Sequence, residues 1–402
     1  MDDNRVLIAG GGPVGTAAAY ILARRGIAVT LFEAGAKIFD DPRAGTIHPP
    51  TLELFAGVGV TPVMLVQGYV VRNYHYRDRR TGLVADFDLS ALADDTTYPF
   101  RLMLEQHKIC AILRGLLQTE FPQHPLLLEH RVESVTQDAS GVAAVVETPA
   151  GRETFRGRYM LGCDGGRSHV RKSMAVEFEG FTYDERFLIL STRYDFEPAG
   201  YALTNYIADP RQWCALFKVP GYDGKGMWRV VFPVDSTTPA DQLYDENRVQ
   251  RLIQGFHGKT GAYVVEHRNV YQVHQRVASC YRDGRILIAG DAAHINNPLG
   301  GMGMNFGFHD VFNLAEKLAR IWFEGADVSM LDLYDRQRRT VAQEYLQRQT
   351  IENKANMENR DVAARQRFYE ELRGIVADRA KLRAYLRRVA MIDGFARAAA
   401  IT

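Results

Sequence analysis

A short glycine pattern near the N-terminus restricts the possible folds of this chain more than any other feature. The pattern is Gly-x-Gly-x-x-Gly, formed by Gly10, Gly12 and Gly15. It follows the aliphatic run 5–9, which is typical of a buried strand, and precedes the helix-like segment 16–25. Residues 28–32 are again strand-like and end at Glu33. This order predicts a β-α-β unit.

Each part of this unit has a physical reason to bind a dinucleotide. The first glycine permits a tight turn, the second lets a pyrophosphate approach the backbone, and the third lets helix and strand pack closely. The start of the helix presents unpaired N–H groups to the phosphates. The carboxylate of Glu33 can accept both ribose hydroxyls, and it would repel the 2′-phosphate of NADP. We therefore expect a dinucleotide other than NADP here.

The composition excludes several classes of protein. Among 402 residues, 49 Lys and Arg balance 48 Asp and Glu, so the formal charge of +1 gives no basic surface for nucleic acid. Hydrophobic residues make up 46%, enough for two or three packed units. No apolar stretch reaches the length of a membrane span, and the acidic start lacks a secretory signal. We expect a cytoplasmic protein without stable membrane association.

The four cysteines are too widely spaced for a Cys-x-x-Cys redox or zinc pair, which predicts four separate reduced thiols.

The rest of the chain alternates between β-rich and helical patterns. The expected elements are a hairpin within 70–92 that turns at 80–82, a helix in 105–120, four strand-like stretches in about 126–164, a β-rich region in 180–235, a buried strand at 285–289, a helix at 305–323, and helices beyond it.

Two further glycine clusters follow strand-like runs. One lies in 159–168 and contains Asp164, and the other spans 290–305 and begins with a Gly-Asp pair. The three motifs, in this order, resemble those of the single-component FAD-dependent aromatic hydroxylases, the family that includes p-hydroxybenzoate hydroxylase. The resemblance extends over about residues 5–340. It implies that the dinucleotide is FAD, with NADPH or NADH as a transient reductant.

The resemblance also implies which residues bind FAD, besides the glycines and Glu33. Asp164 would lie on the pyrophosphate side, Asp291 would accept from ribityl or ribose hydroxyls, and Pro298 would lie beside the flavin ring. The amides of Met304 and Asn305 would face the N1–O2 edge, where the positive end of a helix stabilises an anionic reduced flavin. Further expected contacts are Arg43 near the nicotinamide approach, Gln106 by a hydrogen bond, Val132 through its backbone at the adenine, and Gly303 at the start of the helix.

The fold class implied is mixed α/β, with a Rossmann-like FAD-binding domain, an inserted β-sheet substrate domain and C-terminal helices. The FAD-binding domain would be assembled from residues 1–70, 98–178 and 270–340. The substrate domain would combine 71–97 with 179–269, and 341–402 would form the helical segment. The expected oligomeric state is a monomer or a homodimer.

The function implied is hydroxylation of a small phenolic or other electron-rich aromatic substrate, using NAD(P)H and O2, through a flavin C4a-hydroperoxide. Met302 stands where many members have Gln, and p-hydroxybenzoate hydroxylase has Ala-Lys at the positions of Gly301 and Met302, so the substrate is expected to differ from that of this enzyme. The alternatives are an FAD oxidoreductase that inserts no oxygen or epoxidises an alkene, and a flavin-binding protein without turnover. A nicotinamide dehydrogenase would leave the segment 290–305 unexplained.

Two residues are candidates for the chemistry itself. Tyr206 resembles by position a tyrosine that activates the phenol in the family, although ordinary packing is the alternative. His48 follows the Arg43 loop and is placed to face the flavin as a proton acceptor, with a structural histidine as the alternative. We predict no metal, because His294 and His309 lack further ligands at a suitable spacing.

Overall fold

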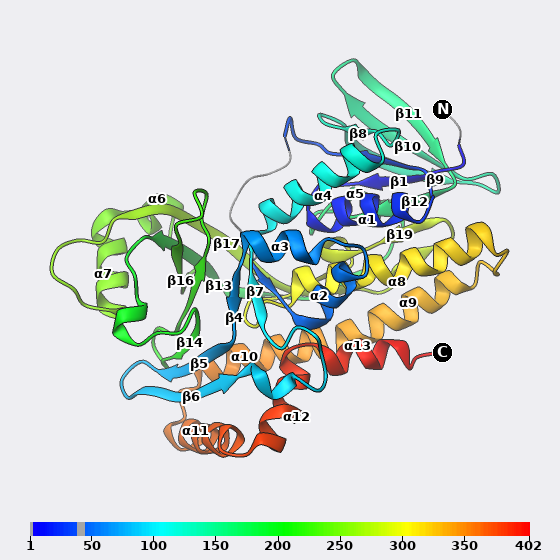
Figure 1. The fold of residues 1–402 in the computed structure, drawn as a ribbon. Coiled ribbons are helices and arrows are strands. Elements are labelled where there is room, and N and C mark those ends of the chain that lie inside the picture. The colour runs from blue at the N-terminus through cyan, green and yellow to red at the C-terminus, as the bar shows by residue number, and fades with distance from the viewer. Residues whose placement is uncertain (1–2, 38–44) are drawn as a thin grey trace.

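The computed structural model describes residues 3–37 and 45–402, and a six-stranded sheet forms the nucleotide-binding part of the fold (Figure 1). Its strands, in the order in which they lie across the sheet, are β18 (Arg282–Asp283), β19 (Ile286–Ile288), β12 (Tyr159–Gly162), β1 (Val6–Ala9), β2 (Val29–Phe32) and β8 (Leu126–Leu127). The strands β2, β1, β12 and β19 run parallel to one another. The β-α-β unit is therefore confirmed, and it lies beside strands from the two later glycine motifs.

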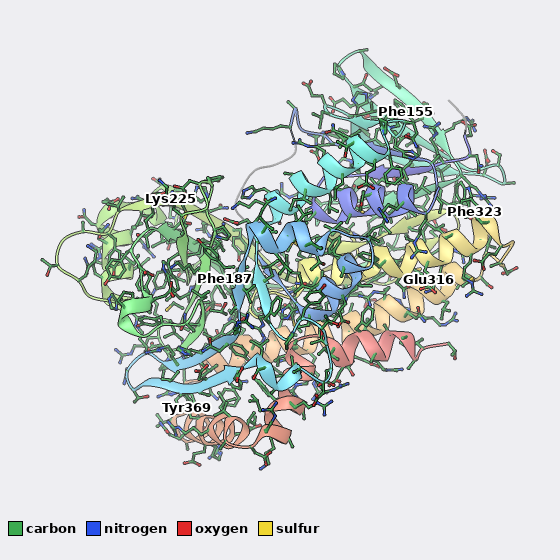
Figure 2. The ribbon with its side chains drawn as sticks, viewed as in Figure 1. Phe155, Phe187, Lys225, Glu316, Phe323 and Tyr369 are labelled. Atoms are coloured by element: carbon green, nitrogen blue, oxygen red, sulfur yellow. The ribbon has the colours of Figure 1, made fainter. Side chains whose placement is uncertain are left out.

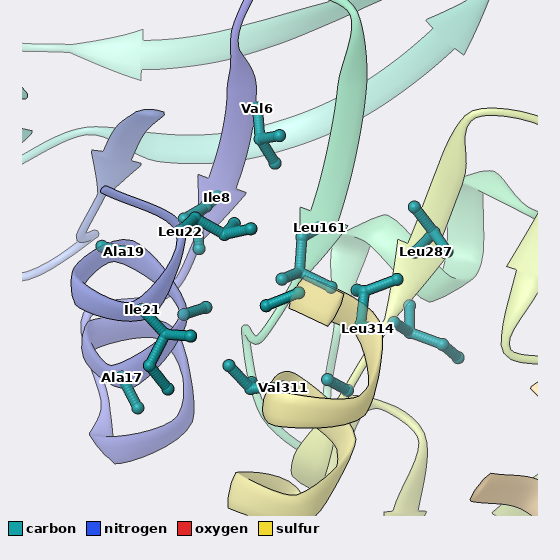
Figure 3. Packing of buried hydrophobic residues seen from close by; sticks show 14 of the residues in the cluster. Val6, Ile8, Ala17, Ala19, Ile21, Leu22, Leu161, Leu287, Val311 and Leu314 are labelled. Atoms are coloured by element: carbon teal, nitrogen blue, oxygen red, sulfur yellow. The ribbon is translucent and has the colours of Figure 1, made fainter. Parts of the chain in front are cut away.

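Two helices cover one face of this sheet, α1 (Pro13–Arg24) and α8 (Gly303–Phe323). Figure 3 shows Ile21 of α1 and Val311 of α8 beneath Ile8 of β1 and Leu161 of β12. All four of these side chains are at most 1% exposed. Burying a side chain of this size stabilises the fold by roughly 1.5–3 kcal/mol, so this interface holds the three glycine motifs in a fixed arrangement.

An eight-stranded sheet forms the second part of the fold. Its strands, in order, are β20 (His294–Ile295), β17 (Val265–Ala278), β13 (Phe178–Thr192), β16 (Met227–Asp235), β15 (Cys214–Val219), β14 (Thr204–Ala208), β5 (Asn73–Asp78) and β6 (Gly82–Asp88). The predicted hairpin is confirmed as β5 and β6, and it joins the later strands because β5 runs parallel to β14. Gly82 starts β6 with a φ of +87°, a conformation that favours glycine at the predicted turn.

Helices fill the chain after β20, as the sequence predicts. They are α9 (Met330–Val341), the π-helix η4 (Ala342–Gln347), α10 (Arg348–Glu358), α11 (Val362–Val376), α12 (Arg379–Val389) and α13 (Ile392–Ala399). Figure 2 labels Tyr369 on α11 and Phe187 on β13, which belong to one buried apolar cluster. The hydroxyl of Tyr369 donates a 2.8 Å hydrogen bond to Asp78 of β5. The C-terminal helices are thus packed onto the eight-stranded sheet.

The remaining elements lie between these layers and at their edges. They are β3 (Thr46–Ile47), α2 (Pro49–Ala56), α3 (Thr61–Gln67), β4 (Tyr69–Val71), η1 (Leu89–Leu92), β7 (Arg101–Met103), α4 (Gln106–Glu120), β9 (Arg131–Gln137), β10 (Val142–Thr148), β11 (Gly151–Gly157), α5 (His169–Ser173), η2 (Glu197–Ala199), α6 (Ala240–Leu243), α7 (Glu246–Phe256) and η3 (Gly290–Ala292). The strands β9 to β11 form one small sheet, and β3, β7 and β4 form another.

Some predicted boundaries differ from the structure. Five strands, not four, lie in 126–164. Of these, β8 and β12 join the six-stranded sheet, and β9, β10 and β11 pair among themselves. The first helix begins at Pro13 rather than at residue 16, since proline is well suited to a first helical position that needs no N–H donor. The four cysteines are free, as expected. No helix among the described residues is both long and apolar enough to cross a membrane.

Candidate active site

The three glycine motifs meet at one edge of the six-stranded sheet. Ala9 pairs with Gly162, and Gly162 pairs with Ile288, so three neighbouring parallel strands end side by side. Ligands of open parallel sheets bind at the carboxyl ends of the strands. The turns that follow β1, β12 and β19 are therefore brought together as the sequence predicts.

The first glycine turn leaves open space beside its second glycine. Gly10 has a φ of +97°, and a Cβ placed on it would lie 2.4 Å from the carbonyl oxygen of Cys163. A Cβ on Gly15 would lie 1.9 Å from the carbonyl oxygen of Gly10. A Cβ on Gly12 would meet no atom of the described chain within 4 Å, apart from its immediate neighbours. The fold itself requires Gly10 and Gly15, whereas Gly12 borders open space, where the family resemblance places the pyrophosphate of FAD.

The start of α1 offers donors to that space. Gly12 occupies the N-cap position and forms no side-chain cap hydrogen bond, and Pro13 follows it. The first N–H groups of a helix have no partner within the helix. Together with the positive end of the helix dipole, they make this turn suitable for an anion such as the pyrophosphate of FAD.

Glu33 is held rigidly at the end of β2. Its Oε2 accepts a 2.7 Å hydrogen bond from the amide of Gly11, and its Oε1 accepts a 2.8 Å hydrogen bond from the amide of Gly35. Each carboxylate oxygen can accept a second hydrogen bond. The carboxylate is thus oriented beside the glycine turn with capacity left for the ribose hydroxyls expected of it.

Asp164 has a second role that the sequence did not reveal. Its Oδ2 accepts a 2.7 Å hydrogen bond from the amide of His169, and its Oδ1 accepts from the hydroxyl of Ser168. Asp164 therefore fixes the start of α5, which follows the second glycine turn. Asp164 follows β12 by two residues, and its contact with the flavin pyrophosphate remains a prediction.

The start of α8 is also uncapped. Its N-cap residue, Met302, forms no side-chain cap hydrogen bond. The first turn of the helix closes with a 3.0 Å hydrogen bond from the amide of Phe306 to the carbonyl of Met302. The amides of Gly303, Met304 and Asn305 precede that bond and lack helical partners. This end of α8 fits the N1–O2 edge of a flavin, as the family resemblance implies.

The side chain of Asn305 ties the third motif to the segment after residue 45. Its Oδ1 accepts a 2.9 Å hydrogen bond from the amide of His48, and its Nδ2 donates to the carbonyls of Thr46 and Gly301. Asn305 is fully buried. This side chain therefore fixes the glycine loop against a distant part of the chain, a role additional to the amide contact expected of it.

A buried ionic network supports the turn at Gly290. The carboxylate of Asp310 accepts hydrogen bonds from the amide of Gly290 at 3.0 Å, from Nε2 of His294 at 2.7 Å and from Nε of Arg338 at 2.7 Å. Burial raises the pKa of Asp310, but His294 and Arg338 outweigh this effect and lower it below its usual value. Sequence reasoning missed this network because its members lie far apart and match no spacing pattern.

His48 is held as a neutral donor. It is fully buried, and its Nε2 lies 2.9 Å from the carbonyl oxygen of Gly300, so Nε2 carries the proton in this contact. Burial, and then the positive charge of Arg101, lower the pKa of His48 to about 3. A group with that pKa is a weak proton acceptor at neutral pH. His48 therefore positions Gly300 of the third motif.

A cavity of about 80 Å³ lies between the third motif and the eight-stranded sheet. Gly300 and Met302 form its wall on the motif side, and Tyr74, Tyr76 and Tyr206 form its wall on the sheet side. Helices α10, α11 and α12 close it with side chains that include Met357, Phe368 and Tyr385. The contribution of the C-terminal helices was not predicted, because their apolar residues follow the ordinary spacing of a buried helix face.

Tyr206 lines this cavity with an available hydroxyl. Its ring packs edge-on against that of Tyr74, with the centroids 6.0 Å apart. No described residue forms a hydrogen bond with the Tyr206 hydroxyl, whereas the hydroxyl of Tyr76 donates a 3.1 Å bond to the carbonyl of Asn356. A ligand in the cavity can therefore use the hydroxyl of Tyr206.

The structure places the other predicted residues as follows. Gln106 is the first residue of α4, Val132 is buried in β9, Asp291 lies in η3, and Pro298 is exposed on the loop before Gly300. Arg43 lies outside the described residues. Within residues 3–37 and 45–402, no group of three His, Cys, Asp or Glu side chains is arranged to hold a metal ion.

Comparison with known proteins identifies the family. Residues 3–349 match the FAD binding domain family. The chain is 34% identical over 391 residues to para-nitrophenol 4-monooxygenase of Pseudomonas sp. (strain WBC-3), covering 97% of this chain and 96% of that protein. It is 30% identical to 6-hydroxy-3-succinoylpyridine 3-monooxygenase of Pseudomonas putida, over 88% of each. The crystal structure of p-nitrophenol 4-monooxygenase from Pseudomonas putida DLL-E4 matches with a TM-score of 0.92 and 30% identity, covering 98% of both chains.

The matches cover 88–98% of each chain, and the similarity to the solved structure extends over nearly the whole fold. The resemblance inferred from the three glycine motifs is therefore confirmed, and so are the mixed α/β fold and FAD as cofactor. The chain belongs to the FAD binding domain family and is an FAD-dependent aromatic monooxygenase.

Proposed function

We propose that this enzyme uses NADH or NADPH and O2 to hydroxylate a small monocyclic phenol in the cavity bounded by Gly300 and Tyr206. The observation that carries the proposal is the position of this cavity, whose walls combine the flavin-binding loop with the aromatic face of the sheet. The relatives named above act on p-nitrophenol and on a hydroxypyridine, both of which carry a ring hydroxyl. When bound, FAD would carry electrons from NAD(P)H to O2 and would deliver one of the two oxygen atoms of O2 to the ring, while the other leaves as water.

The residues of this chain bind and orient the ring. The tyrosine rings of β5 and β14 give an aromatic surface, and the C-terminal helices exclude water from the opposite side. Tyr206 is the candidate partner of the substrate hydroxyl, because its own hydroxyl forms no hydrogen bond with the described chain. His48 holds the carbonyl of Gly300 at the flavin side of the cavity and is a positioning residue.

A phenol panel tests this proposal against the alternatives. The FAD-loaded protein is mixed with NADH or NADPH and a series of phenols, and both the oxidation of the reductant and the mass of the product are measured. We expect particular phenols to accelerate NAD(P)H oxidation and to gain one oxygen. An oxidoreductase that inserts no oxygen would leave every phenol unchanged, and a binding protein without turnover would oxidise no reductant.

A cytoplasmic location, where the nicotinamide reductant is available, and a monomeric or homodimeric state belong to the same proposal. The near-neutral formal charge of +1 supports a small-molecule substrate rather than a nucleic acid.

A further inference from the structure

A loop of the third glycine motif, residues 295–300, is held by the π-helix η4 and by α10. The side chain of Gln347 donates a 3.1 Å hydrogen bond from Nε2 to the carbonyl of Ile295. In the other direction, Nδ2 of the fully buried Asn297 donates a 2.9 Å hydrogen bond to the carbonyl of Thr350. The loop leads directly to the start of α8, so the C-terminal helices help to fix the part of the chain where the flavin is predicted to bind.

Asn353 of α10 holds the far end of this loop. Its Nδ2 donates a 3.0 Å hydrogen bond to the carbonyl of Leu299, and a Cβ placed on Gly300 would lie 2.9 Å from the same nitrogen. The next carbonyl along the loop, that of Gly300, lies 2.9 Å from Nε2 of His48. Two successive carbonyls are thus bound by side chains from opposite parts of the chain.

The same face of α10 lines the cavity. Its lining side chains include Gln349, Asn353, Asn356 and Met357, which are spaced as neighbours on one face of a helix. Nε2 of Gln349 donates a 2.8 Å hydrogen bond to Oδ1 of Asn353, which turns the amide nitrogen of Asn353 toward the loop. Among the described residues of α10, Asn353 is the side chain that both lines the cavity and bonds to the loop.

The π-helix η4 explains why these amides face the cavity. The segments α9, η4 and α10 follow one another without a break, so η4 interrupts one long helical run. A π-helical turn takes in an additional residue, and each residue of an α-helix turns the chain by roughly 100°. The interruption therefore rotates the side chains of α10 relative to those of α9. Such turns occur frequently at functional sites.

We propose that Asn353 is a positioning residue that couples the occupation of the cavity to the binding of FAD at the loop before α8. The inference rests on the proposed function, because it takes the cavity as the substrate site. A ligand packed against Asn353 restricts its amide to the orientation that donates to Leu299, and this favours the loop arrangement that binds FAD. The coupling is reciprocal, so bound FAD favours the ligand by the same factor.

Equilibrium dialysis of the FAD-loaded, full-length protein tests the inference without a reductant, so that no turnover occurs. Free and bound FAD are measured in the presence and absence of saturating 4-nitrophenol. In the wild-type protein, 4-nitrophenol should lower the dissociation constant of FAD about fivefold or more, as is usual for two coupled sites. An FAD dissociation constant that does not respond to 4-nitrophenol would refute the coupling.

Variants assign the effect to Asn353. Asn353→Leu nearly keeps the shape of the side chain and adds no charge, but it removes the donor to Leu299. In this variant, the effect of 4-nitrophenol on the FAD dissociation constant should fall to about twofold or less. Asn359→Leu is the matched control. Asn359 caps the end of α10 outside the cavity, where it accepts a hydrogen bond from the amide of Asp361, so this variant should keep the wild-type ratio.

The ratio separates positioning from a purely structural role. If Asn353 only stabilised the fold, Asn353→Leu would weaken FAD binding equally with and without 4-nitrophenol, and an unchanged ratio would overturn the inference. Should this variant lose FAD altogether, Gln349→Leu provides a second test. It leaves the loop contact in place but removes the donor that orients Asn353, so it should also reduce the ratio.

Hydrogen–deuterium exchange gives an independent readout in the same loop. In the wild-type protein, 4-nitrophenol should slow the exchange of the backbone amides in 296–303. In Asn353→Leu, the same ligand should leave their exchange unchanged. Equal slowing of these amides in both proteins would contradict the role of Asn353.

The two proposals can fail separately. A ligand effect that depends on Asn353, with no hydroxylation of any phenol, would contradict the proposed function and leave the coupling standing. Hydroxylation of phenols together with the same ratio in wild type and Asn353→Leu would contradict the role of Asn353 alone.

Discussion

The backbone amide of Gly290 donates a 3.0 Å hydrogen bond to the buried carboxylate of Asp310. Gly290 opens the third glycine motif, and Asp310 lies on α8, the helix whose start is predicted to face the flavin. The same carboxylate pairs with Arg338 of α9 and with His294. One side chain thus ties together the third glycine motif, helix α8 and α9, the first of the C-terminal helices.

Asp310→Asn should therefore reduce both stability and FAD affinity. The substitution keeps the shape of the side chain but leaves the charge of Arg338 buried without a counter-ion. Breaking a buried pair in this way costs roughly 3–5 kcal/mol. Chemical unfolding should show a loss of that size, and fluorescence titration should show weaker FAD binding. Asp332→Asn is the control, because its pair with Arg282 is half exposed and contributes about 1 kcal/mol or less. Equal effects of the two substitutions would contradict the account.

Gly12→Ala and Gly15→Ala should separate ligand binding from folding. A Cβ on Gly12 meets no described atom within 4 Å, so the variant should fold like wild type. It should nevertheless bind FAD at least tenfold more weakly, which corresponds to about 1.4 kcal/mol, because the methyl group occupies the space of the pyrophosphate. Gly15→Ala forces a contact of 1.9 Å with the carbonyl oxygen of Gly10 and should lower the melting temperature of the apoprotein. Undiminished FAD affinity in Gly12→Ala would contradict the assigned role.

His48 should make the fold less stable as the pH falls. Its folded-state pKa is about 3, below the ordinary 6.5, so the unfolded chain binds a proton below pH 6.5 that the folded chain excludes. From pH 6.5 to 5 this loss amounts to about 2 kcal/mol for one such group. Unfolding curves across this range should show the decline, and His48→Gln should reduce its slope. His309, whose pKa is also lowered by burial, should contribute part of the slope that remains. An unchanged slope in His48→Gln would show that His48 is accessible to protons in the folded state.

Tyr206→Phe should impair turnover without affecting FAD. Its hydroxyl lines the cavity and is the proposed partner of the substrate hydroxyl. Removing a group that assists proton transfer lowers kcat on the order of a hundredfold. Tyr76→Phe is the matched control, because its hydroxyl already donates to the carbonyl of Asn356. Steady-state kinetics with a hydroxylated phenol would measure both, and equal kcat values in the two variants would remove Tyr206 from the proton transfer.

Much of the fold could be predicted from local sequence patterns. The turn at Gly10, Gly12 and Gly15 could be predicted because only glycine fits sterically at Gly10 and Gly15. The parallel strands and the hairpin of β5 and β6 could be predicted from the spacing of hydrophobic residues and from the turn residues. The three-motif order was enough to identify FAD. In each case the information lies within short stretches of consecutive residues, although the three motifs themselves are far apart in the chain.

The rest depends on contacts between distant residues, which no local pattern encodes. Asp310 and Arg338 pair across two helices, and Tyr385 reaches the cavity from near the end of the chain. Arg101 belongs to no motif in the sequence, and only its burial in β7, with Nε and Nη1 unbonded, distinguishes it. The strands of each large sheet also come from widely separated segments of the chain. The predicted domain boundaries remain a prediction.

The central claim is that this enzyme inserts an oxygen atom from O2 into a phenolic ring. Turnover of a phenol with NAD(P)H under isotopically labelled O2, followed by mass analysis of the product, measures this directly. The account predicts a product that carries one labelled oxygen, formed only in the presence of reductant and FAD. Oxidation of NAD(P)H to yield only hydrogen peroxide, with every phenol recovered unchanged, would contradict it.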